Sequence, residues 1–139
     1  MEVNSLQIYC DGGARGNPGP AGIGIVIVEV NGRENKLSKF IGEKTNNQAE
    51  YEAVLFALET VMVEYGETTK IDFFLDSELV VKQMNSEYKI KNERLGGLLI
   101  KIRNLIIEND LDVTFKHIPR EKNHHADRLV NEAINGGYK

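Results

Sequence analysis

Four acidic residues occupy positions where the hydrophobic pattern of the sequence places a carboxylate close to the core. Asp11 ends an alternating strand pattern, Asp76 ends a second one, and Glu50 lies on the apolar side of a helical pattern. Asp127 borders the apolar stripe of the last helical pattern. Carboxylates gathered in one pocket would repel one another, and hard divalent cations with oxygen ligands relieve that repulsion. Two such ions can activate a water and stabilise a leaving oxygen at a phosphate, which predicts metal-assisted hydrolysis.

Two of these acids also have a simpler interpretation. A glutamate in the first turn of a helix is favoured by the helix dipole, so Glu50 could lie solvated at the helix edge. An aspartate between a strand and a helix is an ordinary helix N-cap, which is the alternative for Asp76. Taken one at a time, these residues leave both interpretations open.

Hydrophobic periodicity and turn signals predict the elements that must position the acids. Five strand patterns are present, at residues 6–11, 22–30, 33–41, 70–75 and 112–118. Asn31-Gly32 is a strong hairpin signal between the second and third strands. Four helical patterns are also present, at residues 46–65 with Gly66 as C-cap, after Ser77, at 93–109, and in a C-terminal segment whose apolar stripe begins at Ala126.

This order of elements predicts an α/β fold with a five-stranded mixed sheet. Three antiparallel strands come first and two parallel strands follow, joined by helical crossovers, so that helices flank both faces. In such a sheet the ends of the first and fourth strands can lie side by side. Asp11 and Asp76 would then be neighbours, with Glu50 reaching in from the first helix and Asp127 from the last.

A compact loop is expected at residues 12–20, because its glycines allow positive φ and its prolines fix φ. Such a loop can bring backbone N–H groups, Arg15 and the Asn17 amide to a phosphate or sugar. The alternative is a turn-rich lead into a hairpin. The glycine spacing matches neither a dinucleotide fingerprint nor a P-loop.

Composition fits one globular domain over residues 1–139, of which 41% are hydrophobic. The chain shows no apolar run of bilayer length and no signal-peptide pattern, so we expect a cytoplasmic protein without a membrane partner. A single cysteine, Cys10, excludes an internal disulfide framework and fits a small buried hydrophobe.

The net charge of −4 argues at first against a nucleic-acid partner. The chain has 21 acids and 17 bases, however, so the four candidate metal ligands account for the whole acidic excess. Bound divalent ions would add positive charge at the site, and the local field rather than the total then decides which partner binds.

Four segments of the chain resemble the type 1 ribonucleases H, in the compact archaeal, bacterial and plant-like subgroup of that family. They occur in the family's order and span nearly the whole sequence, at residues 9–20, 45–50, 75–77 and 123–127. The resemblance implies the ribonuclease H-like fold and an endoribonuclease, and we expect the protein to be a monomer. Such an enzyme would hydrolyse the RNA strand of an RNA–DNA hybrid with metal-activated water and little sequence preference, leaving 5′-phosphate and 3′-hydroxyl ends.

The same resemblance implies a role for each matched residue. Asp11, Glu50, Asp76 and Asp127 would be catalytic and would hold two Mg²⁺ ions, or alternatively Mn²⁺, with Asp11 bridging them. The side-chain amides that contact ribose 2′-hydroxyls would come from Asn17, Asn46 and Asn47. An amide can both donate a hydrogen bond to a 2′-hydroxyl and accept one from it. Thr45 would hold a phosphate of the DNA strand. The remaining substrate-binding residues expected in the loop are Gly12, Gly13 and Arg15.

The sequence departs from many relatives of that family in two places. A shorter stretch replaces the loop whose histidine assists product release, and Arg120, Glu121 or His124 is expected to substitute; His117 falls inside a strand and is not assigned that role. The basic protrusion with tryptophans is also absent, which predicts weak intrinsic binding or a partner protein. His124 and its neighbour His125 are expected to point apart on a helix, which argues against a metal site there.

Three other functions share parts of this sequence pattern. The same site could cleave double-stranded RNA. Strand transfer would need further DNA-binding segments, for which 139 residues leave no room. The third function is that of a non-catalytic module that binds hybrids, but four acids facing phosphates would not help such a module to bind.

Overall fold

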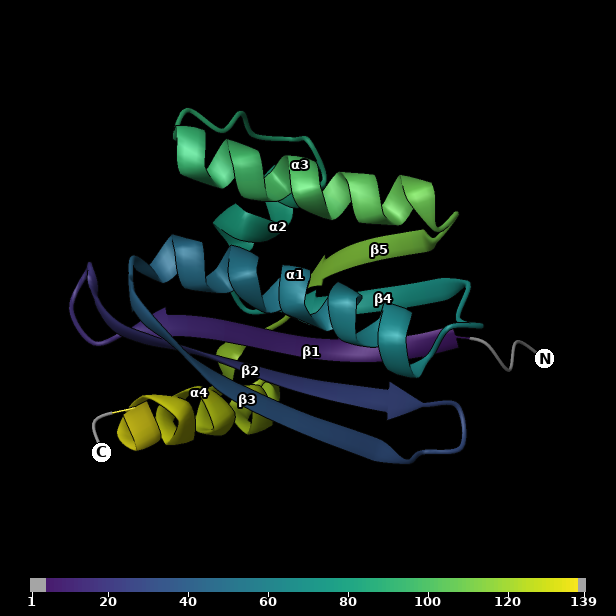
Figure 1. Ribbon diagram of the computed structural model, residues 1–139, viewed down its shortest axis with the longest axis horizontal. Helices are drawn as coiled ribbons and strands as arrows, with labels where there is room; N and C mark the ends of the chain where they lie inside the picture. Colours follow the sequence, from purple (N-terminus) through teal and green to yellow (C-terminus); the bar gives the residue numbers. More distant parts are fainter. Residues whose placement is uncertain (1–4, 138–139) are drawn as a thin grey trace.

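A five-stranded sheet with strand order β3-β2-β1-β4-β5 forms the centre of the protein (Figure 1). The computed structural model describes residues 5–137. Its strands are β1 (Ser5–Ala14), β2 (Gly19–Glu29), β3 (Glu34–Lys44), β4 (Lys70–Leu75) and β5 (Asp112–His117). β1, β2 and β3 pair antiparallel, whereas β4 pairs parallel with both β1 and β5. The predicted α/β fold and mixed sheet are therefore confirmed.

Helices lie on both faces of this sheet (Figure 1). They are α1 (Asn46–Glu64), α2 (Glu78–Met84), α3 (Glu93–Glu108) and α4 (His124–Gly137), with a 3₁₀ turn at Arg120–Lys122. α1 packs on β1 and against α3, and α4 packs on β1, β2 and β3 from the opposite side. The main core lies under α1, where apolar side chains such as Ile8, Phe73 and Leu58 are fully buried. Cys10 is a free thiol in this core, as expected.

The first two strands are longer than the periodicity predicts. β1 does not end at Asp11 but continues to Ala14, and β2 begins at Gly19, so the expected loop of residues 12–20 shrinks to residues 15–18. Gly12 and Gly13 are paired residues in the ladder, opposite Ile23 and Gly22. The prediction of a loop at Gly12 and Gly13 is wrong because glycine is not only a turn residue, and here it allows close packing within a strand.

Gly12 is the point where α1 comes closest to the sheet. A Cβ atom on this residue would overlap the backbone carbonyl of Ala49 in α1. Gly24 in β2 has the same role on the other face, where a Cβ atom would overlap the carbonyl of Ala126 in α4. Bare backbone at these two positions lets both helices sit directly on the central strands.

Other boundaries differ from the expectations by a few residues. α1 ends with Tyr65 as its C-cap rather than Gly66. β3 begins and ends later than expected, and β5 stops one residue earlier than expected. Within residues 5–137, no helix is both long enough and apolar enough to cross a bilayer.

Candidate active site

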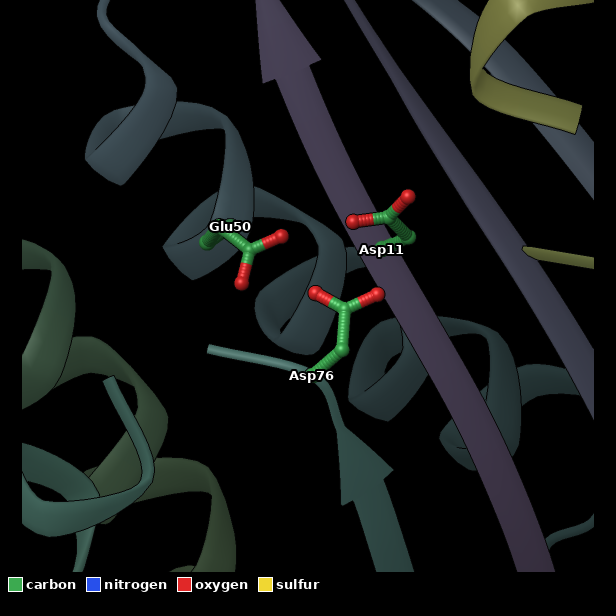
Figure 2. A group of neighbouring side chains, drawn as sticks. All are labelled: Asp11, Glu50 and Asp76. Atoms are coloured by element: carbon green, nitrogen blue, oxygen red, sulfur yellow. The ribbon is translucent and has the colours of Figure 1, made fainter. Parts of the chain in front are cut away.

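Three carboxylates from separate segments converge at one end of the sheet. One oxygen each of Asp11, Glu50 and Asp76 can be chosen such that all three lie within 4.8 Å of one another. Asp11 comes from β1, Glu50 from α1, and Asp76 from the segment that follows β4; their side chains point toward one another in Figure 2. The convergence expected for these three acids is therefore present in the fold.

The position of Glu50 is set by the start of α1. Thr45 caps this helix, because its hydroxyl accepts a hydrogen bond from the backbone N–H of Gln48 at 3.1 Å and the Gln48 side chain accepts one from the Thr45 N–H at 2.9 Å. One turn later, Glu50 Oε1 accepts a hydrogen bond from the Gly12 N–H at 2.8 Å. Only 5% of Glu50 is exposed, so the interpretation of a solvated first-turn glutamate is wrong.

Asp76 is oriented by a residue that was not among the expected site residues. Asn123 Nδ2 donates hydrogen bonds to Asp76 Oδ2 at 3.2 Å and to the Cys10 carbonyl at 2.8 Å. Asn123 is 1% exposed, and it joins the segment before α4 to β1 and to the end of β4. Asp76 itself is not the cap of α2, because Ser77 takes that position. The sequence places Asn123 in a matched segment but gives no sign that its amide is buried.

Burial raises the pKa of both central carboxyls. The pKa of Asp11 lies well above its ordinary value, chiefly because the group is removed from water and then because Glu50, Asp76 and Asp127 lie nearby. Burial also raises the pKa of Glu50, while hydrogen bonds from Asp11 and from the Gly12 N–H and the charge of Arg120 oppose the rise. The two groups titrate as a pair, and the fold by itself resists full ionisation of the cluster.

A divalent cation fits this arrangement. Glu50 Oε2 is buried and has no hydrogen-bond partner within the described part of the chain. A buried carboxylate oxygen without a partner is costly. Oxygen atoms from three converging acids are the donor set that hard cations such as Mg²⁺ and Mn²⁺ prefer. The residues present therefore suit such an ion.

Asp127 lies at the same pocket but apart from the central group. It is half-buried in the first turn of α4 and lines an open pocket of about 520 Å³ together with the three central acids. Its charge contributes to the raised pKa of Asp11, so the two carboxyls are electrostatically close. Asp127 is not one of the residues whose oxygens meet within 4.8 Å.

Most, but not all, of the substrate-binding residues expected from the sequence line the pocket. Those that line the pocket with the acids are Gly12, Gly13, Arg15, Asn46 and Asn47. Thr45 and Asn17 do not line it, and both have structural contacts. Thr45 is the α1 cap, and Asn17 Oδ1 accepts a hydrogen bond from the Asn46 N–H at 3.0 Å.

Only one of the three expected accessory residues lines the pocket. Arg120 lines the pocket, whereas Glu121 and His124 do not. The ring of His124 instead lies 3.0 Å from the Glu121 carbonyl, measured from Nδ1. The expectation that His124 and His125 point apart is wrong, since their ring centroids are 4.1 Å apart. His124 is the first residue of α4, and the contact of its Nδ1 with the Glu121 carbonyl sets the direction of its ring.

The pH dependence of stability should reveal the acidic pair in the metal-free protein. A carboxyl whose pKa is higher in the folded state than in the unfolded state stabilises the fold at low pH. That contribution is lost as pH rises from the ordinary carboxyl range toward the raised folded pKa. We expect the melting temperature in EDTA to fall between about pH 5 and pH 8, by the equivalent of about 2 kcal/mol.

Two comparisons check this expectation. Asp11→Asn should flatten the profile and melt at a higher temperature than the wild type at pH 8 in EDTA. Excess Mg²⁺ should stabilise the wild type more at pH 8 than at pH 5, because protons must leave the ligands before the ion binds. A metal-free profile that rises over the same interval would show that the pair does not hold its protons.

Asn123→Ala should weaken both the fold and the site. The substitution leaves the buried Cys10 carbonyl without its donor and frees the Asp76 carboxylate to turn. We expect a loss of about 2 kcal/mol in the free energy of unfolding and at least a tenfold loss of activity. Asn104→Ala, at an exposed residue of α3, is the control and should lower neither quantity. Full activity in Asn123→Ala would show that Asp76 needs no support from this amide.

A mixed sheet with one acid in β1, a second directly after the neighbouring strand β4, and a third from the first helix defines a ribonuclease H-like domain. Comparisons with known proteins agree. A family model described as reverse transcriptase-like matches residues 9–133. Ribonuclease HI of Halobacterium salinarum is 39% identical over 130 residues, which cover 93% of this chain and 64% of that protein.

A solved structure supports the same assignment to the ribonuclease H-like class. The crystal structure of LC11-RNase H1 in complex with an RNA/DNA hybrid superposes with a TM-score of 0.91 at 46% identity, covering 96% of this chain and 99% of that one. This chain belongs to the ribonuclease H family. It is also 37% identical to a bifunctional protein of Mycobacterium tuberculosis. The chain spans about two thirds of the Halobacterium relative and about one third, 35%, of the mycobacterial one.

Proposed function

We propose that this protein is an endoribonuclease that hydrolyses the RNA strand of RNA–DNA hybrids. The observation that carries the proposal is the group of three converging carboxylates with an unpartnered buried oxygen on Glu50. A family member of the same fold has been crystallised with an RNA/DNA hybrid, which supports the choice of substrate.

Asp11, Glu50 and Asp76 would hold the metal, and Asp127 would complete the set from α4. Two Mg²⁺ ions, or Mn²⁺ in their place, would supply activation of the attacking water and stabilisation of the leaving oxygen. The chain's own part is to fix the ligands before the substrate arrives. The Gly12 N–H holds Glu50, the Asn123 amide holds Asp76, and burial restricts the side chains of Asp11 and Glu50.

Selection of RNA would come from the Asn46 amide in the pocket and from the Asn17 amide next to it. Asn17 Oδ1 and Asn46 Oδ1 both accept backbone hydrogen bonds, from Asn46 and from Ala14. The amide oxygens are thereby engaged, and the NH₂ groups are left to donate. A ribose 2′-hydroxyl is an acceptor that DNA lacks, so these two amides suit the RNA strand. Contacts to sugars and phosphates rather than base edges predict little sequence preference.

All four acids come from one chain, which supports action as a monomer. A cytoplasmic location stays a prediction from the sequence. Cleavage of double-stranded RNA is the second candidate activity, because the 2′-hydroxyl is present on both strands of that duplex and the same amides could contact it.

A substrate panel tests the proposal. Labelled RNA–DNA hybrid, duplex RNA and duplex DNA are incubated with the protein in Mg²⁺, in Mn²⁺ and in EDTA, and the product ends are analysed. We expect cleavage of the hybrid, no cleavage of duplex DNA, no reaction in EDTA, and 5′-phosphate with 3′-hydroxyl ends. Faster cleavage of duplex RNA would favour the second activity. Binding of the hybrid without cleavage in either metal would mean that the domain is a binding module.

A further inference from the structure

Arg15 is held in a fixed position by two asparagines of α4. Its guanidinium Nη1 donates a hydrogen bond to Asn135 Oδ1 at 2.7 Å, and Nη2 donates a longer one to Asn131 Oδ1 at 3.4 Å. These residues lie 120 and 116 positions from Arg15 along the chain. Asn131 is fixed in turn, because its Nδ2 donates to the Asp127 carbonyl at 3.1 Å, which leaves its oxygen to face Arg15.

The two asparagines position the guanidinium without neutralising it. Amide oxygens are uncharged acceptors, and Arg15 forms no ion pair with a carboxylate of the described residues. A guanidinium has five N–H donors in a fixed fork, and the two bonds to α4 leave donors for a further acceptor. Arg15 is exposed, so its full positive charge is available to a ligand from solution.

The loop that carries Arg15 is attached on both sides of the pocket. Asn17 ties it to the start of α1 through the Asn46 N–H, and Arg15 ties it to α4. Arg15 and Asn131 both line the pocket that holds the acids, on the side formed by α4. A cation at this rim is suited to a phosphate of a strand that lies across the acids, since planar guanidinium donors match phosphate oxygens.

We propose that Asn131 and Asn135 are positioning residues that hold the charged Arg15 guanidinium at the pocket rim, where it binds a backbone phosphate of the nucleic acid. The inference rests on the proposed function for its substrate but concerns a separate contact. It assigns to α4 a second role besides carrying Asp127. Arg15 would contact the substrate, and the asparagines would act only through Arg15.

A mutant cycle in the full chain tests this dependence. Arg15→Ala, the double variant Asn131→Ala/Asn135→Ala, and the triple variant are compared in steady-state cleavage of a short labelled hybrid at several KCl concentrations. Arg15→Ala should raise KM about tenfold and reduce the slope of log KM against log salt by about one, as expected for one lost phosphate contact. The double variant should raise KM about threefold with a smaller loss of slope. All variants should keep kcat within about twofold of the wild type.

The triple variant is decisive. If the asparagines act through Arg15, the triple variant should have the KM and salt slope of Arg15→Ala alone. Independent effects that add in the triple variant, or an unchanged salt slope in Arg15→Ala, would overturn the inference. Asn104→Ala on the exposed side of α3 controls for loss of an asparagine from a helix, and melting temperatures show whether each variant is folded. If the wild type cleaves no hybrid, the proposed function fails instead.

Discussion

Asp11→Asn is expected to lower kcat for hybrid cleavage by on the order of a thousandfold or more. Asparagine keeps the size of the side chain but replaces one carboxylate oxygen with an NH₂ group and removes the charge. Asp11 belongs to a group with Glu50 and Asp76 in which one oxygen of each acid lies within 4.8 Å of the others, so an NH₂ donor placed there would oppose a cation. Single-turnover cleavage in excess Mg²⁺ measures the effect.

Asp112→Asn is the matched control for this loss. Asp112 is an exposed aspartate at the start of β5, at the opposite end of that strand from the acids. The same chemical change there should leave kcat within about twofold of the wild type. Equal cleavage by Asp11→Asn and the wild type would mean that the carboxylate group is not the catalytic centre. Circular dichroism would establish that Asp11→Asn is folded before its activity is interpreted.

Gly12→Ala should cause the largest loss of stability among single substitutions near the site. The added methyl group would overlap the Ala49 carbonyl, which belongs to the backbone of α1 and cannot rotate away. α1 would have to move from the sheet and break the bond from the Gly12 N–H to Glu50. We expect a loss of at least about 3 kcal/mol in the free energy of unfolding, measured by urea denaturation, together with loss of metal-dependent stabilisation.

Gly97→Ala is the corresponding control in α3. No atom lies within 4 Å of the position that its Cβ would take, and the residue is exposed in the helix. Alanine is a better helix former than glycine, so this variant should be more stable than the wild type by about 0.5 to 1 kcal/mol. Gly12→Ala with wild-type stability would show that α1 and β1 are not in the close contact described here.

Much of this fold follows from local patterns in the sequence. The alternation in β1 and β4, the helical stripe after Glu50 and the Asn31-Gly32 turn are short-range signals, and each one predicted the right type of element. The order of these elements then restricts the sheet to a few topologies, which is why the side-by-side ends of β1 and β4 could be expected. Element boundaries were less predictable, because the pairing of Gly12 and Gly13 with β2 depends on the partner strand.

The residue types and their order along the chain determined which acids were candidates and what ions they would suit. Only the tertiary structure decided which oxygens meet: Asp11, Glu50 and Asp76 form the close group, while Asp127 stands at the pocket wall. It also decided that Asn123 supports Asp76 and that Asn131 and Asn135 hold Arg15. The physical reason is that periodicity places a side chain on a face of its own element, whereas a hydrogen bond or a shared ion depends on the distance between elements. That distance is set by close packing, such as the approach of α1 to β1 at Gly12.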